Sequence, residues 1–282
     1  MNRYALPKCL DETLTLLAKE RWAVVAGGTD FYPLQGDSPV TGSIMDIHHV
    51  DSLRFIREED SGWRIGALAT WTDIIGAKLP RAFDGLKLAA REIGSVQIQN
   101  AATLAGNLCN ASPAADGVPP LLTLNAELEL SSVDGKRLLP LGEFLVGSRI
   151  TLLAPNELVT AIVIPRVSER SRSHFIKLGS RKYLVISIAM VSALIQLSSE
   201  QKIRMARIAV GSCSAVAQRL HDLERQLLGK DASVNLDEFL QTAHVANLSP
   251  IDDIRASGEF RLSAALELVR RVLQRCLVES QS

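Results

Sequence analysis

Two short segments carry small, uncharged residues in an order that suits phosphate binding. The first follows an apolar stretch and reads Val-Ala-Gly-Gly-Thr-Asp-Phe over residues 25–31. Its two glycines can adopt positive φ values and leave amide N–H groups uncovered, which would form an anion-binding concavity from backbone dipoles. A plain turn between a strand and a helix would use the same residues. The segment is not a Rossmann fingerprint, because no GxGxxG pattern follows the strand.

The second segment, residues 99–116, offers neutral hydrogen-bonding groups and one acid. Thr103, Asn107 and Ser112 supply hydroxyl and amide groups, Gly106 permits close approach, and Asp116 is a lone carboxylate. Hydroxyls and amides suit a pyrophosphate, and a carboxylate suits ribose hydroxyls. Asp116 could equally be a solvated turn residue. Two such segments in one chain favour a shared ligand such as a dinucleotide.

The charge distribution supports a ligand held without cations. The chain has 31 Lys+Arg and 31 Asp+Glu, a formal net charge of zero, so it lacks the basic excess typical of nucleic-acid binders. Residues 92–135 contain no Lys, Arg or His. The densest part of this region, residues 100–120, predicts a long loop. Loops of that length inside a compact domain usually bind something, although a plain surface loop is the alternative.

The surrounding pattern mixes strands and helices without strict βαβ alternation, which predicts the α+β class. Asp11 is the expected N-cap of a first helix, and Asp134-Gly135 is the expected turn of a hairpin. A polar run after Pro165 predicts a boundary between domains 1–168 and 169–282. The second domain is expected to contain strands at residues 174–178, 186–197 and 203–211 and a helix at residues 259–277, with Ser257 as its cap.

The remaining composition indicates the compartment. No apolar run approaches the ~20 residues that span a bilayer, and no secretory signal is recognisable at the N-terminus. The four cysteines are far apart and form no CxxC pair, so neither a disulfide framework nor a cysteine-held metal is expected. These features predict a cytoplasmic protein with no metal site. No acid–base pair near the two loops marks a catalytic residue.

Longer stretches around these motifs resemble one known family. They are AGGTDF at residues 26–31, IGSVQIQNAATLAGNLCNASPAAD at residues 93–116 and FIKLGSRKYLVIS at residues 175–187, with further similarity at residues 63–70 and 249–257. In order and spacing the chain resembles the FAD-binding medium subunit of molybdenum hydroxylases, the xanthine dehydrogenase and carbon monoxide dehydrogenase family. The likeness covers nearly the whole chain.

The resemblance implies an N-terminal FAD-binding domain of the vanillyl-alcohol oxidase-like (PCMH) type and a smaller C-terminal domain built on a three-stranded antiparallel sheet with helices. It implies an oxidoreductase subunit that passes electrons from a partner's iron–sulfur (2Fe-2S) clusters through FAD to NAD, a quinone or oxygen. A large molybdopterin-containing subunit would be the other partner. No nucleic acid and no membrane span are implied.

The resemblance also assigns roles. Residues 26–31 and the second loop would hold the pyrophosphate, Asp116 would contact the adenosine portion, Ile93 would lie against the cofactor, and Lys177 and Leu184 would lie near the flavin ring. Lys177 could instead be a solvated strand lysine, and Leu184 and Ile93 could be ordinary core residues. The predicted cofactor-binding residues are Val25, Ala26, Gly27, Gly28, Thr29, Asp30, Phe31, Ile93, Thr103, Ala105, Gly106, Asn107, Asp116, Lys177 and Leu184.

The chain departs from the family pattern in the second loop. Relatives usually read T-I-G-G-N there, whereas this chain has Leu104 and Ala105 in place of the Ile and the first Gly, and Val185 replaces a frequent Asp. A methyl group at position 105 requires a negative φ. Two other functions follow from these departures as alternatives: a non-enzymatic scaffold subunit that has lost or weakened its flavin binding, and a stand-alone FAD-dependent oxidoreductase.

Overall fold

The computed structural model describes residues 3–36, 38, 41–182 and 184–278. The chain packs as two compact units, and each unit is built from three separate stretches of the sequence. Unit 1 comprises Met1–Ala77, Ser95–Ala111 and Ala126–Arg166, and unit 2 comprises Lys78–Gly94, Ser112–Asn125 and Val167–Ser282. The two domains predicted from the sequence, residues 1–168 and 169–282, are a different division from these packing units and stay a prediction.

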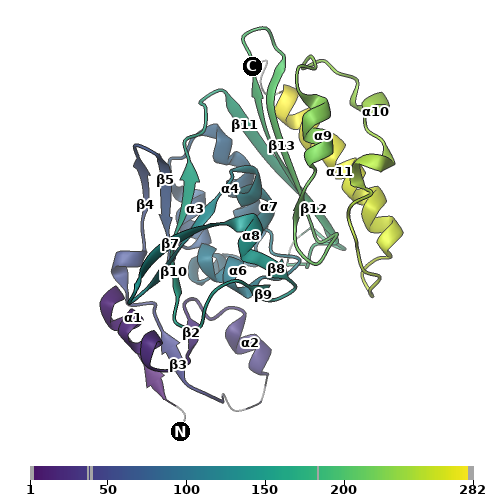
Figure 1. Ribbon diagram of the computed structural model, residues 1–282. Coiled ribbons are helices and arrows are strands. Elements are labelled where there is room, and N and C mark those ends of the chain that lie inside the picture. Colours follow the sequence, from purple (N-terminus) through teal and green to yellow (C-terminus); the bar gives the residue numbers. More distant parts are fainter. Residues whose placement is uncertain (1–2, 37, 39–40, 183, 279–282) are drawn as a thin grey trace. The chain divides into compact units, whose positions relative to one another are not determined.

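Unit 1 is built on two sheets and a small hairpin (Figure 1). The first sheet is parallel in the order β1-β3-β2, and the second is antiparallel in the order β4-β5-β10-β6-β7. The hairpin of β6 and β7 is present as the sequence predicts, but its turn is Val133-Asp134, one residue earlier than the predicted Asp134-Gly135, because Gly135 already pairs with Ser132. The strands are β1 (Tyr4–Ala5), β2 (Ala23–Val25), β3 (Ile44–Asp46), β4 (Ile56–Glu59), β5 (Gly62–Gly66), β6 (Glu127–Ser132), β7 (Gly135–Pro140), β8 (Leu145–Gly147), β9 (Ile150–Thr151) and β10 (Leu158–Pro165).

The helices of unit 1 are short, apart from the first. Leu14 and Leu17 of that helix are buried together with Met45 of β3 in one apolar cluster. Its N-cap is Cys9, which makes no side-chain capping bond, so the assignment of Asp11 was wrong; Asp11 lies in the first turn. The helices are α1 (Leu10–Lys19), α2 (Phe31–Gln35), α3 (Trp71–Gly76), α5 (Val96–Ala101), α6 (Leu104–Asn110) and α8 (Leu141–Phe144), with a 3-10 turn at Asp51–Leu53.

The expected loop at residues 100–120 is largely helical instead. Ser95 and Thr103 act as N-caps of α5 and α6, because their side-chain oxygens accept from the amides of Ile98 and Gly106. Leu104 and Leu108 of α6 are fully buried. Local capping and burial therefore organise a region whose small residues predicted a loop.

Unit 2 has helices packed on an antiparallel sheet in the order β11-β12-β13-β14 (Figure 1). Val191 of β12 belongs to the apolar cluster that contains Val269 of α11, whereas Met190 packs with Ala89 of α4. Because successive strand residues face opposite sides, α11 and α4 cover opposite faces. The elements are α4 (Asp84–Glu92), α7 (Val118–Thr123), β11 (Ser171–Leu178), β12 (Ala189–Leu197), β13 (Ile203–Gly211), β14 (Gln218–Arg219), α9 (His221–Leu227), α10 (Leu236–Phe239) and α11 (Gly258–Val278), with 3-10 turns at Arg81–Phe83 and Thr242–Val245.

The α+β prediction and the antiparallel C-terminal sheet are confirmed. The three expected strands are β11, β12 and β13, and the structure adds the two-residue strand β14. Ser257 caps α11 by accepting from the amide of Phe260 at 3.2 Å. Within the described ranges, no helix combines the length and apolarity needed to cross a membrane.

Candidate cofactor site

The Gly27-Gly28 loop follows β2 in unit 1 and presents uncovered backbone donors. Gly28 has a φ of +67°, the left-handed conformation that glycine adopts without strain. The amides of residues 27–30 make no hydrogen bond to any other described residue. A turn with several N–H groups that have no protein partner is compatible with the anion-binding arrangement that the sequence suggested.

The first loop lies directly against the second. A Cβ added at Gly27 would stand 1.9 Å from the carbonyl oxygen of Ala101, so only glycine permits this approach. The residues after Ala101 are fixed by backbone bonds: Trp71 donates to the carbonyl of Ala102, and Leu104 donates to the carbonyl of Ala69. Two segments more than 70 residues apart in sequence therefore meet at one place.

Thr103, Gly106 and Asn107 provide the polar groups of the second segment. The Thr103 hydroxyl accepts from the Gly106 amide at 3.0 Å and keeps its own proton to donate. The side-chain oxygen of Asn107 is buried and has no hydrogen-bond partner among the described residues. A buried polar atom without a partner is costly, and a bound polar ligand would satisfy it. These groups fit a dinucleotide.

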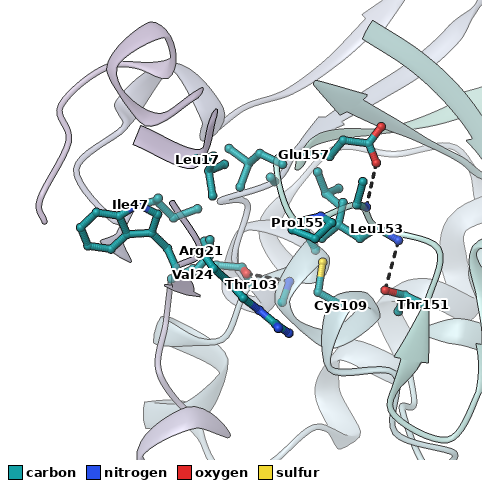
Figure 2. A pocket seen from close by; sticks show the side chains of 18 residues that line it. Leu17, Arg21, Val24, Ile47, Thr103, Cys109, Thr151, Leu153, Pro155 and Glu157 are labelled. Atoms are coloured by element: carbon teal, nitrogen blue, oxygen red, sulfur yellow. Dashed lines mark hydrogen bonds between the residues drawn. The ribbon is translucent and has the colours of Figure 1, made fainter. Parts of the chain in front are cut away.

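A cavity of about 340 Å³ opens beside the two loops, entirely within unit 1. Thr103 of the second loop lies in its wall (Figure 2). Gly106 of the same loop and Ala26 of the first loop also contribute to the wall. The rest of its wall is mainly apolar. Its volume is at the lower end of the ~300–1,000 Å³ of ligand pockets, so it suits one part of a dinucleotide. The other lining residues are Leu17, Arg21, Trp22, Val24, Ile47, Ala67, Ala105, Cys109, Thr151, Leu153, Ala154, Pro155, Glu157, Leu158 and Val159.

Sequence reasoning missed most of this wall. Glu157 holds the turn at residues 154–157 by accepting from the Ala154 amide at 2.9 Å and pairing with Arg137 at 2.6 Å. Arg21 is an exposed cation at the cavity, outside the cation-free region. Apolar residues, a proline and a lone arginine carry no motif, so only the fold could bring them to the site.

The substituted residue Ala105 is compatible with the site. Ala105 lies in α6 and is not among the residues with positive φ. Its backbone therefore has the negative φ that a methyl group at this position requires. The side chain of Ala105 is buried. At the adjacent Gly106, by contrast, an added Cβ would lie 2.8 Å from the Thr103 hydroxyl oxygen. The second glycine of the family pattern is thus the one that this loop requires.

Four predicted residues lie in unit 2. Lys177 of β11 and Asp116 form a buried ion pair at 2.7 Å, and Ser187 donates to Asp116 at 2.6 Å. Burial raises the pKa of the Asp116 carboxyl above its ordinary value, while Lys177 and Ser187 act to lower it. The alternatives of a solvated Lys177 and a solvated Asp116 are therefore wrong. Leu184 is half-exposed with a φ of +51°, and Ile93, which follows α4, is partly buried.

The other predicted residues belong to unit 1. Phe31 begins α2 and packs edge-to-face with Tyr32 at a centroid distance of 5.2 Å. Val25 is buried and pairs with Asp46 of β3. Unit 1 thus brings together Val25, Ala26, Gly27, Gly28, Thr29, Asp30, Phe31, Thr103, Ala105, Gly106 and Asn107. No group of three His, Cys, Asp or Glu side chains in the described part of the chain could hold a metal ion.

Comparisons with known proteins identify the family of this chain. Residues 1–167 match the FAD binding domain in molybdopterin dehydrogenase, and residues 174–276 match the CO dehydrogenase flavoprotein C-terminal domain. The chain is 30% identical to the nicotine 6-hydroxylase medium subunit of Paenarthrobacter nicotinovorans, over 96% of this chain and 95% of that relative. It is 28% identical to the carbon monoxide dehydrogenase medium chain of Hydrogenophaga pseudoflava, over 96% and 95%.

Solved structures give the same result. A carbon monoxide dehydrogenase from Hydrogenophaga pseudoflava superposes with a TM-score of 0.89 at 25% identity, covering 99% of this chain and 97% of that one. The reconstituted CO dehydrogenase from Oligotropha carboxidovorans gives a TM-score of 0.90 at 25% identity, over 99% and 98%. The fold and the site define an FAD-binding flavoprotein. The chain belongs to the family of FAD-binding medium subunits of molybdenum hydroxylases, the xanthine and CO dehydrogenase family.

Proposed function

We propose that this chain is the electron-transfer subunit of a cytoplasmic molybdenum hydroxylase complex. It would take electrons from the 2Fe-2S clusters of one partner subunit and deliver them to NAD, a quinone or oxygen, while a molybdopterin-containing subunit oxidises the substrate. The family relationship and the names of the relatives, which are medium subunits of hydroxylases and dehydrogenases, support this role.

The amides of residues 27–30 carry the proposal, because they have no partner among the described residues and Gly27 lies against Ala101, in the segment that also holds Asn107. In this assignment, these amides and the Thr103 hydroxyl hold the pyrophosphate of FAD. A cation is unnecessary, since several aligned N–H dipoles provide a concentrated positive field. Gly27 keeps the two loops together, and Gly106 leaves the Thr103 hydroxyl in place.

The cavity in unit 1 then receives the adenosine end of FAD. Its apolar wall suits the faces of an adenine ring, and Arg21 and Glu157 supply polar groups at its border. From the family resemblance, Lys177 and Leu184 are proposed to lie near the flavin ring, and Ile93 against the cofactor. Asp116 is proposed for the adenosine portion, as the resemblance implies, and its carboxylate pairs with Lys177.

FAD, when bound, would supply the redox chemistry, because the flavin can accept and release one or two electrons. The chain's own residues would bind and orient the cofactor. No acid or base of this chain is assigned to the reaction, since electron relay needs position and potential rather than proton abstraction.

Binding of FAD in preference to FMN tests the assignment. The purified chain, stripped of nucleotide, is titrated with FAD, FMN and ADP by calorimetry and visible absorption. FAD is expected to bind at one equivalent, with ADP as a competitor and FMN at least about 100-fold weaker, since FMN lacks the adenosine half. Equal affinity for FMN and FAD, or no competition by ADP, would contradict the assignment.

Reconstitution tests the electron route. In the purified complex, removal of FAD is expected to abolish reduction of NAD or quinone while leaving reduction of an artificial acceptor that draws directly on the iron–sulfur clusters. Unchanged reduction of the physiological acceptor by the FAD-depleted complex would exclude the relay role.

A further inference from the structure

The cavity of unit 1 has two walls of different construction. Leu17 and Ile47 lie on one side, and Leu153 and Pro155 face them from the other (Figure 2). Leu17 and Ile47 belong to one buried apolar cluster, so their wall is part of the core. Leu153 is only partly buried and Pro155 is exposed, so their wall is thin and borders solvent. We call residues 151–157, which form this thin wall, the strap.

Few backbone hydrogen bonds tie the strap to the rest of the described chain. The amide of Leu152 donates to the carbonyl of Phe144 at 2.9 Å. The amides of Leu153 and Ala154, by contrast, donate to side chains of the strap itself. A segment with few bonds to its surroundings opens at a low cost in free energy. The strap therefore depends on side-chain contacts for a fixed position.

Arg137 fastens the strap at both ends. Arg137 lies in β7, the edge strand of the five-stranded sheet. Its guanidinium donates to the Leu152 carbonyl at 3.1 Å and to the two carboxylate oxygens of Glu157 at 2.6 and 2.9 Å. Glu157 in turn accepts from the Ala154 amide at 2.9 Å. A planar guanidinium matches a carboxylate at two points, which a lysine cannot do, so one arginine joins the start of the strap to its end.

We propose that Arg137 is a positioning residue for the cofactor: its two-point contact with Glu157 holds the strap across the cavity, and opening of this contact admits and releases the adenosine end of FAD. This rests on the proposed function, in which the unit 1 cavity receives that end. Arg137 is not among the residues that line the cavity, so it acts through the strap. Binding of any adenosine-containing nucleotide should depend on the contact, and binding of a flavin without adenosine should not.

Three variants and one matched control test this role. R137M removes the contact, E157Q removes the charge of its partner, and R137K keeps the positive charge without the two-point geometry. The control is R54M, because Arg54 makes a comparable two-point contact with Asp73, at 2.9 and 3.0 Å, in the same unit. Neither Arg54 nor Asp73 lines the cavity.

Three quantities are measured on each full-length chain. The first is the rate of FAD release, followed by the recovery of flavin fluorescence after mixing with excess ADP. The second is the affinity for FAD, ADP and FMN, from calorimetry. The third is the rate of thermolysin cleavage before Leu152 and Leu153 in the cofactor-free chain, which reports opening of the strap without any ligand.

R137M is expected to release FAD at least about fivefold faster and to bind FAD and ADP correspondingly more weakly, while its affinity for FMN stays within about twofold. Cleavage of the strap should rise by at least about fivefold, because local opening becomes easier. E157Q should act in the same direction by a smaller factor, since its amide oxygen still accepts a bond. R137K should fall between R137M and the natural chain, and R54M should change none of the three quantities.

Unchanged FAD release in R137M would overturn the proposal, whatever the cleavage rate. Faster release with unchanged cleavage would overturn it too, because Arg137 would then not act through the strap. Equal losses of affinity for FAD and FMN, or the same acceleration in R54M, would show a general loosening of unit 1 instead. If R137M does not fold, E157Q and R137K decide by the same criteria. If the natural chain binds neither FAD nor ADP, the proposed function fails, and the cleavage rates still decide whether Arg137 holds the strap.

Discussion

Unit 1 and unit 2 place their predicted site residues in opposite environments. In unit 1 these residues are mostly small and uncharged, and a Cβ at Gly27 would lie 1.9 Å from the Ala101 carbonyl oxygen. In unit 2, Asp116 and Lys177 are oppositely charged, buried and bonded to each other at 2.7 Å. The first arrangement depends on close backbone approach, so it should tolerate no added atom. The second depends on charge balance, so it should tolerate no lost charge.

The same contrast divides the cation-free region. Residues 95–111 pack in unit 1, where backbone amides supply the donors, and residues 112–125 pack in unit 2, where cations come from the strands. Arg207 and Arg219 donate to the carbonyls of Thr123 and Leu122 at the end of α7, and Lys177 pairs with Asp116. Residues 112–125 contain no cation themselves, so the strands of unit 2 provide the cationic side chains that contact them. These cations bind groups of the protein itself.

The largest effect is expected from removing the charge of Lys177. K177M leaves the Asp116 carboxylate buried without its partner, which should reduce the free energy of unfolding by about 3–5 kcal/mol. The double variant K177M/D116N should recover a large part of this loss, because it removes both charges. Urea denaturation measures each value.

The exposed pair of Arg54 and Asp73 provides the control for that prediction. R54M should cost no more than about 1 kcal/mol, since solvent screens the charges. Equal losses in R54M and K177M would show that burial does not distinguish the two pairs.

The next effect is expected from adding one methyl group to unit 1. G27A forces the two loops apart and should cost about 3 kcal/mol of stability together with most of the affinity for FAD. The control is G76A at the end of α3, where no atom lies within 4 Å of the added Cβ and the cost should be close to zero. Both are measured by urea denaturation and FAD titration. Tight FAD binding by G27A would show that the close approach is not required.

Restoring the family glycine at position 105 should have a smaller and less intuitive effect. Ala105 is buried in helix α6, so A105G should destabilise the chain by about 1 kcal/mol through its lower helix propensity. It should not strengthen FAD binding, because Gly106 already provides the close approach. Thermal unfolding and FAD titration check this, and a gain in affinity would contradict the assignment of the glycine role.

The smallest effect concerns a charged group of unit 2 that is remote from the proposed site residues in sequence. The backbone amide of Arg255, with the side chains of Arg255 and Arg261, lowers the pKa of Asp253 to about 2. A carboxyl whose pKa is lower in the folded chain stabilises the fold above its unfolded pKa and loses this contribution as the pH falls. The difference in unfolding temperature between the natural chain and D253N should therefore be present at pH 5 and shrink toward zero near pH 2. A constant difference over this range would rule out the charge of Asp253 as its cause.

Local patterns in the sequence predicted the helices, strands and turns whose formation depends on residues close together in the chain. The hairpin of β6 and β7, strand β13 and helix α11 have strong turn or periodic signals, and all three are present. The two glycine-containing segments also meet as expected. The family resemblance supplied what the pattern could not, namely the identity of the cofactor.

The remaining features depend on contacts between distant residues. Ala89 packs with Phe175 and Met190, which assigns α4 to unit 2 although it precedes unit 1's α5 in sequence. The cavity wall at Leu153 and Pro155 has no local signal, because such residues occur in many turns. Ser187 is one of many serines, and only its bond to Asp116 distinguishes it.

Protection of Cys109 by FAD tests the central claim most directly. Cys109 is exposed and lines the unit 1 cavity, where desolvation raises the pKa of its thiol to about 12. Cys9 is also exposed but is not among the lining residues. The full chain is alkylated with N-ethylmaleimide at alkaline pH, because the thiolate is the reactive form, with and without saturating FAD, and both thiols are followed by mass spectrometry. FAD should slow the modification of Cys109 by at least about tenfold and leave Cys9 unchanged. Binding of FAD with equal modification rates at Cys109 would place the cofactor outside this cavity and contradict the account.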